Sequence, residues 1–235
     1  MDDENSLSTP PKLSKKEKAY ELSKVAITSV VPFGGLIEVF IDEIIKPPTT
    51  KRLHEWIGRI AQEVERLKKE DKRFDFKTLS ENEEFISFFH HTINTVRMTH
   101  QTEKIEFLQN GLFNSVLNES IQENIKHIFL NFIEECTVEH IRILKCLDNP
   151  REWFEVNNKP VPDIVISGAI ATILERAFPD FRTDYMEFIV DDLHRKGLIG
   201  FDRGTLNVSM TPRGVFESRT TSMGKQFLNF IEDYK

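Results

Sequence analysis

The chain has 235 residues, of which 31 are Lys or Arg and 38 are Asp or Glu, so its formal net charge is −7 at pH 7. Hydrophobic residues make up 39% and charged residues 29%. This composition is typical of soluble globular domains and excludes collagen-like, low-complexity and wholly disordered chains. The length accommodates one large domain or two small ones, with enough residues to bury a core.

The N-terminal residues 1–11 are acidic and polar, the reverse of a signal peptide, and we expect a disordered tail there. Two cysteines, Cys136 and Cys146, are too few for the disulfide framework of a secreted domain. The longest uncharged stretch, 25–37, is shorter than the roughly 20 residues that a membrane-spanning helix needs. We therefore expect a cytoplasmic protein without a transmembrane segment.

The first predicted helices cover residues 12–31 and 36–45, separated by Pro32–Gly35 and ended by Pro47-Pro48. A long helix is then expected from a cap at Thr49 or Thr50 to about Lys69. Its apolar residues recur at helical spacing and form one stripe, which consists of Leu53, Trp56, Ile57, Ile60, Ala61, Val64 and Leu67.

Two further helix starts are predicted from capping boxes, in which a serine and a glutamate three residues later satisfy each other's free backbone donors. These boxes are Ser80–Glu83 and Ser120–Glu123, and another helix is expected from Thr102. Residues 12–135 are accordingly predicted to form an all-helical domain.

From Thr137 onward, the sequence predicts helices followed by a hairpin, in contrast to the all-helical pattern before it. Helices are expected from Thr137 to Asp148, over 167–177 and over 183–196, followed by a hairpin that pairs 198–201 with 206–210 and by a last helix that Ser222 caps. This order is typical of a winged helix. The predicted fold class is mainly α, with an all-helical N-terminal unit and a winged-helix-like domain with a small β-hairpin over 137–235.

The sequence contains no complete catalytic, metal-binding or phosphate-binding motif among those considered below. His54-Glu55 begins like a zinc-protease sequence, but Gly58 occupies the position of the second histidine. Gly224-Lys225 resembles the end of a phosphate-binding loop, but Gln226 stands where Ser or Thr is required. We therefore predict no catalytic residue, no cofactor and no metal site, and expect the histidines at 90, 91 and 100 to be surface or hydrogen-bonded side chains.

A winged helix suggests DNA binding, with candidate contacts at Arg195, Lys196 and Arg203. Phosphate contacts require positive charge on the reading helix. Residues 183–196 carry four acidic side chains against two basic ones, so we expect protein binding in preference to DNA binding.

The apolar segment 25–45 has two interpretations. It is either a buried helical hairpin or an exposed surface for a partner, a second copy or a lipid interface, and Asp42 and Glu43 disfavour an anionic lipid. If the segment is exposed, pairing with its copy would hide it, and we predict a homodimer. The candidate interaction surface is formed by Phe33, Leu36, Ile37 and Phe40.

The order of parts resembles the Abi-alpha family, which is associated with abortive phage infection. The residues that carry the resemblance are Val31–Gly35, Lys51-Arg52 through Leu67, Glu81–Arg97, Glu103-Lys104 and Thr221–Leu228. The resemblance implies a cytosolic bacterial protein that works by binding, in phage defence, and it defines no catalytic residues. The predicted function is thus a non-enzymatic interaction or regulatory protein. The alternatives are a winged-helix DNA-binding regulator and an effector that perturbs membranes through residues 25–45.

Overall fold

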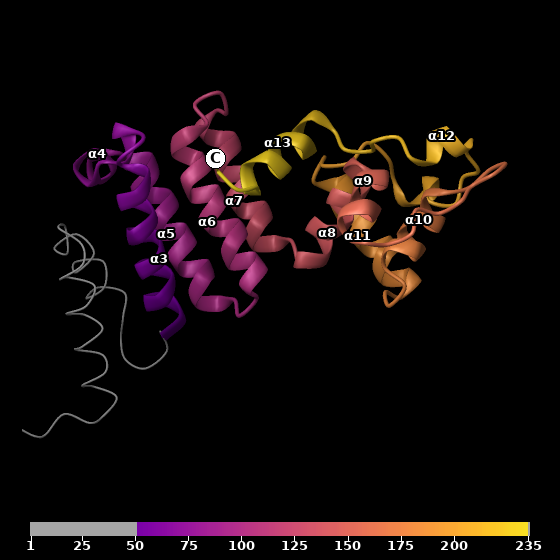
Figure 1. The fold of residues 1–235 in the computed structure, drawn as a ribbon, viewed down its shortest axis with the longest axis horizontal. Coiled ribbons are helices and arrows are strands. Elements are labelled where there is room, and N and C mark those ends of the chain that lie inside the picture. The colour runs from indigo at the N-terminus through magenta and orange to yellow at the C-terminus, as the bar shows by residue number, and fades with distance from the viewer. Residues whose placement is uncertain (1–50, 235) are drawn as a thin grey trace, which may run out of the picture. The chain divides into compact units, whose positions relative to one another are not determined.

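The computed structural model describes residues 51–234, which form eleven α-helices and two 3-10 helices (Figure 1). The predicted tail 1–11, the predicted helices 12–45 and the candidate interaction surface Phe33, Leu36, Ile37 and Phe40 lie outside the described residues. The chain divides into two compact units at Ile86 and Ser87, inside helix α5. Each unit is described by itself below.

The described part of the first unit is built on α3, Lys51–Leu67. All seven residues of the predicted apolar stripe are buried, which confirms the amphipathic pattern. The 3-10 helix η1, Lys72–Phe74, contacts both α3 and the short helix α4, Phe76–Glu81. Asp71 caps η1 by accepting a hydrogen bond from the Arg73 N–H, and the Phe74 ring is fully buried.

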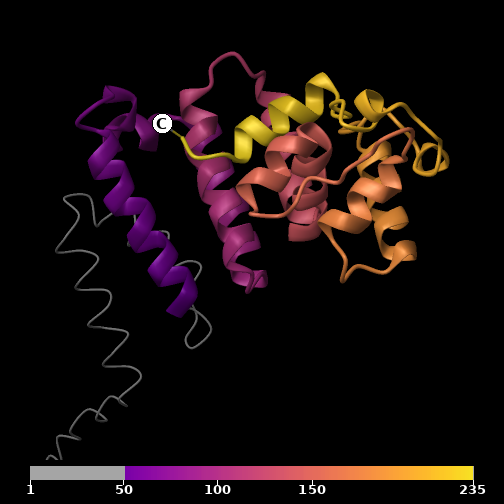
Figure 2. The same cartoon turned by 45° about the vertical axis from the view of Figure 1, so that its right-hand side comes forward.

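The second unit begins within α5, Glu83–Met98, and continues with α6, Thr102–Leu117, and α7, Glu123–Glu135. The last helix, α13, Ser222–Ile231, packs against α6, and α6 packs against α7 (Figure 1 and Figure 2). The Phe129 ring of α7 lies 5.5 Å from both Phe227 and Phe230 of α13, measured between ring centroids. Helices far apart in the sequence therefore share one aromatic core.

The rest of the second unit is arranged around α8, Val138–Asp148, which contacts α9, α10, α11 and α13. Helix α9 spans Pro150–Val156, α10 spans Ile170–Ala177 and α11 spans Thr183–Arg195. The elements η2, Arg203–Thr205, and α12, Pro212–Val215, lie between α11 and α13. The chain is thus mainly helical in its described part.

The predicted hairpin is not formed. Between residues 51 and 234 there is no β-strand, only isolated bridges that join Gly168 to Met210 and Ile199 to Thr220. Asp202 accepts a hydrogen bond from the Thr205 N–H and begins η2 instead of a hairpin turn. The Leu206 carbonyl accepts from the Ala171 N–H, so segment 206–210 pairs with residues around the start of α10 and not with 198–201.

Several helix starts also differ from those predicted. Asn82, not Ser80, accepts a hydrogen bond from the first turn of α5, at the Phe85 N–H. Ser120 bonds to Asn118 and does not cap α7. Thr137, by contrast, forms a capping box on α8 with His140 as its partner, which confirms the predicted cap.

The predicted domains, 12–135 and 137–235, stay predictions, but helices on both sides of position 136 contact one another. Helix α13 packs on α6 and α8, so residues on both sides of 136 share the core of the second unit. The segment after 136 ends by returning to the helices that precede it. This return is a tertiary contact between residues about a hundred positions apart, which periodicity within a single helix does not reveal.

Candidate functional site

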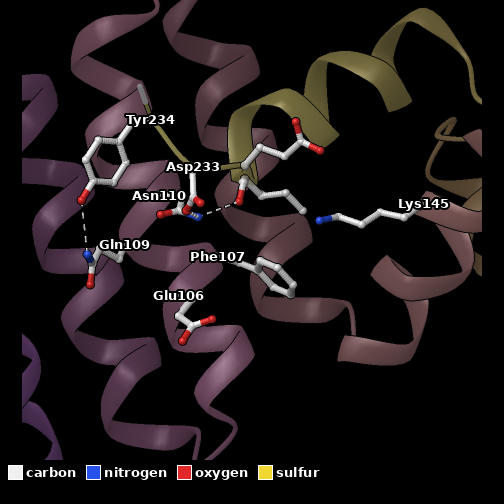
Figure 3. A pocket seen from close by; sticks show the side chains of 9 residues that line it. Glu106, Phe107, Gln109, Asn110, Lys145, Asp233 and Tyr234 are labelled. Carbon is white, nitrogen blue, oxygen red and sulfur yellow. Dashed lines mark hydrogen bonds between the residues drawn. The ribbon is translucent and has the colours of Figure 1, made fainter. Parts of the chain in front are cut away.

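A groove with a volume of about 540 Å3 lies beside the C-terminal segment of the second unit. Figure 3 shows Glu106 and Phe107 on α6, Lys145 reaching in from α8, and Asp233 and Tyr234 on the segment after α13. The groove is thus built from three parts of the chain. Its lining consists of Glu106, Phe107, Gln109, Asn110, Lys145, Ile231, Glu232, Asp233 and Tyr234.

Two asparagines one turn apart on α6 hold the wall that the C-terminal segment provides. The Asn114 Nδ2 donates to the carbonyls of Phe230 and Glu232, each at 2.9 Å. The Asn110 Nδ2 donates to the Ile231 carbonyl at 3.1 Å and lies 3.4 Å from the Asp233 Oδ1. Carbonyls in the last turn of a helix lack intrahelical donors, and these amides supply them. The end of α13 is therefore capped from another helix.

Tyr234 closes this wall. Its ring lies 4.5 Å from the Phe113 ring, measured between centroids, and the Gln109 Nε2 donates to its hydroxyl at 3.4 Å. The close packing of α13 on α6 depends on Gly111, since a Cβ at that position would lie 3.0 Å from a carbon of the Phe230 ring. In α6, Gly111 therefore allows the close approach of α13, and Asn114 supplies hydrogen bonds to the end of α13.

The groove carries more negative than positive charge. Glu106, Glu232 and Asp233 contribute three carboxylates against the single ammonium of Lys145, a net charge of −3 + 1 = −2. The Lys145 Nζ lies 5.8 Å from the centroid of the Phe107 ring. Within residues 51–234, the carboxylates of Glu106 and Glu232 have neither a hydrogen-bond nor an ion-pair partner. The groove thus presents unneutralised acceptors beside an aromatic ring.

The candidate DNA contacts are each engaged by acidic side chains. The Lys196 side chain is only 13% exposed and bonds to Glu135 at 2.6 Å and to Asp192 at 3.3 Å. Arg195, which is exposed, also lies 3.3 Å from Asp192. Burial lowers the pKa of Lys196, but the hydrogen bond to Glu135 and the charge of Asp192 outweigh this effect, and the net shift is upward.

Arg203, the third candidate, lies at the start of η2 and is separated from the other two. Its side chain is 60% exposed and approaches the Glu187 carboxylate of α11 at 4.0 Å. Arg195 and Lys196 therefore meet at one acidic residue, whereas Arg203 faces another, and the three do not form a free basic patch.

The corner between α7 and α8 is a second polar cluster. The Lys104 Nζ donates to the carbonyls of Glu134 and Cys136, at 2.6 Å and 3.1 Å, and so caps the C-terminus of α7. Burial raises the pKa of the Cys136 thiol to about 12. Burial also lowers the pKa of His140, against the charge of Asp192, whose Oδ2 lies 3.4 Å from its Nε2. Burial thus keeps the Cys136 thiol in its neutral form, which is less nucleophilic than the thiolate.

Of the histidines singled out from the sequence, His90 and His91 lie on α5 and His100 follows its end. His91 lies 3.1 Å from Glu134 of α7, and across the described part of the chain no three His, Cys, Asp or Glu side chains are close enough to hold one metal ion. Gly224 also has a structural explanation, because a Cβ there would lie 2.1 Å from the Leu198 carbonyl oxygen. Helix α13 approaches the backbone of segment 198–200 closely, and only glycine fits at that point.

None of the groove residues was predicted from the sequence to form a functional site. The available signal was the pair of asparagines at 110 and 114, polar side chains spaced one turn apart on one face of the helix. Their partners are main-chain carbonyls more than a hundred residues away, and neither composition nor spacing identifies such partners.

Comparisons with known proteins returned no protein-family model, no curated protein and no solved structure that matches the chain. None of the helices between residues 51 and 234 combines the length and apolar character needed to cross a membrane.

Proposed function

We propose that the chain is a regulatory protein that acts by binding another protein, without catalysing a reaction. The observation that carries this proposal is the groove beside the C-terminal segment. Its carboxylates, amides, lysine and aromatic rings are side chains that fix a partner by charge and hydrogen bonding. These groups come from α6, α8 and the segment after α13, so the packing of the second unit holds them in place.

The electrostatics of α11 support protein binding over DNA binding. A helix that reads DNA must offer cations to phosphates. On α11 and its C-cap, Arg195 and Lys196 share the Asp192 carboxylate, and Arg203 faces Glu187. The carboxylates beside these cations repel a phosphate and reduce the local positive charge, so duplex binding is correspondingly disfavoured.

Mobility-shift measurements with duplex DNA at physiological salt test this choice. We expect no shift at sub-micromolar protein. A shift that weakens steeply with added salt would contradict the proposal. If such a shift were also lost in Arg203→Ala but retained in Arg213→Ala, a control that removes a 93% exposed arginine, the contact would lie at η2.

The wider setting is proposed on the resemblance to the Abi-alpha family. On this resemblance, the proposed setting is the bacterial cytoplasm and the proposed role is defence against phage through abortive infection. The helix order α8, α10 and α11, followed by segment 198–201 with its isolated bridge from Ile199 to Thr220, supports a winged-helix-like relationship for residues 137–235. A homodimer through Phe33, Leu36, Ile37 and Phe40 remains a prediction that rests on the sequence.

A further inference from the structure

We infer that the groove beside the C-terminal segment binds the guanidinium group of an arginine side chain from the partner protein. This inference rests on the proposed function and adds the chemistry of the partner. The groove volume of about 540 Å3 falls within the range of roughly 300–1,000 Å3 that is usual for pockets that enclose a small ligand. It can therefore receive one long side chain together with its flanking backbone.

The lining matches a planar cation. Guanidinium carries five N–H donors in a rigid fork, pairs with carboxylates and stacks on aromatic faces. Glu106 projects from α6, whereas Asp233 belongs to the segment after α13, so the carboxylates come from two different elements (Figure 3). Guanidinium offers donors in several directions, whereas the ammonium of lysine is a compact point charge.

The Phe107 ring already accepts a cation. The Lys145 Nζ lies 5.8 Å from its centroid, within the distance at which a positive charge is attracted to a ring face. Within the described residues this lysine takes part in no ion pair, although three carboxylates line the same groove. The ring and the carboxylates thus favour positive charge, and Lys145 neutralises only part of the negative charge.

Some carboxylates on other described helices are neutralised within the chain. Arg66 pairs with Glu63 at 2.5 Å, and Arg182 pairs with Asp184 at 2.5 Å. In the groove, Glu106 and Glu232 lack such a neighbour, and a net charge of −2 remains. The negative charge of the whole chain, −7, adds long-range attraction for a basic partner.

The inference is tested by titrating the full-length, 15N-labelled chain with acetyl-Gly-Arg-Gly-amide and with the same peptide carrying citrulline. Citrulline keeps the shape of arginine and removes its charge. We expect the arginine peptide to shift the amide signals of residues 106–110 and 231–234, and to bind about ten-fold more tightly than the citrulline peptide. A lysine peptide is expected to bind more weakly than the arginine peptide.

Three variants assign the effect to the groove. Glu106→Gln combined with Asp233→Asn should weaken binding of the arginine peptide by about 5- to 10-fold, because two acceptor charges are removed. Lys145→Met keeps most of the apolar stem and removes a competing cation, so binding should tighten by about 2- to 5-fold. Glu155→Gln removes an exposed carboxylate of α9 outside the groove and should leave binding unchanged.

Equal binding of the arginine and citrulline peptides would overturn the inference, as would weaker binding in Lys145→Met. Signal changes spread over the whole acidic surface would also contradict it. Tighter binding of spermidine than of the arginine peptide would assign the groove to a free polyamine instead. If the arginine and citrulline peptides bind equally but the groove variants lose the protein partner in cells, protein binding through the groove stands and only the arginine site falls.

Discussion

At the scale of single residues, Gly224 has the tightest steric requirement of the described glycines. A Cβ at this position would lie 2.1 Å from the Leu198 carbonyl oxygen, which is backbone and cannot rotate away. We expect Gly224→Ala to lower the free energy of unfolding by about 3 kcal/mol, because α13 must move off segment 198–200. Thermal unfolding followed by circular dichroism measures the loss.

Gly58 is the matched control for that substitution. It lies within α3, and a Cβ there would meet nothing within 4 Å. Gly58→Ala should therefore stabilise its helix by about 0.5–1 kcal/mol, since alanine has the higher helix propensity. Equal melting temperatures for the two variants would show that α13 does not approach Leu198 as described.

Residue identity alone did not reveal these roles. Gly224-Lys225 drew attention for its likeness to a phosphate-binding loop, whereas its importance comes from a backbone 26 positions away. The histidines at 90, 91 and 100 drew attention because they cluster in sequence. The buried histidine is instead His140, whose side chain caps α8 and lies beside Asp192. Both cases depend on tertiary neighbours that local spacing does not encode.

At the scale of elements, the end of α13 depends on the side-chain amide of Asn114. Asn114→Ala removes hydrogen bonds to the carbonyls of Phe230 and Glu232 and should cost about 1–2 kcal/mol in the free energy of unfolding. Asn229→Ala, which truncates an exposed side chain on α13, should change it by less than about 0.5 kcal/mol. Denaturant unfolding of both variants makes the comparison, and equal midpoints would rule out the cap.

Elements with a strong periodic pattern were predictable, and elements formed by pairing were not. The stripe of α3 is buried as expected, because amphipathic spacing of 3.6 residues directly specifies one buried face. Segments 198–201 and 206–210 alternate in the manner of a hairpin, yet each pairs elsewhere, with Thr220 and Gly168. Short alternating segments fit several partners; here the hydrogen bonds of 198–200 join residues 219–221, and those of 206–210 join residues 168–171.

At the scale of the whole molecule, the mainly helical architecture of the described residues was predictable from composition and periodicity, whereas the packing of α13 on α6 was not. Helix α13 returns to α6, so residues on both sides of position 136 pack together, and the predicted domains 12–135 and 137–235 stay predictions. This return also creates the groove, since its wall is the segment that follows α13. Any change that detaches α13 should therefore remove the groove as well as part of the core.

Recovery of a partner from cells tests the central claim most directly. The full-length chain and two variants, Glu106→Gln/Asp233→Asn and Glu155→Gln, would be cross-linked in the organism that encodes them, purified after nuclease treatment and analysed by mass spectrometry. We expect the wild type and Glu155→Gln to recover the same protein, cross-linked near residues 106–110 or 231–234, and the groove variant to recover at least about five-fold less. Recovery that nuclease treatment abolishes, or that is equal in all three chains, would contradict protein binding through this groove.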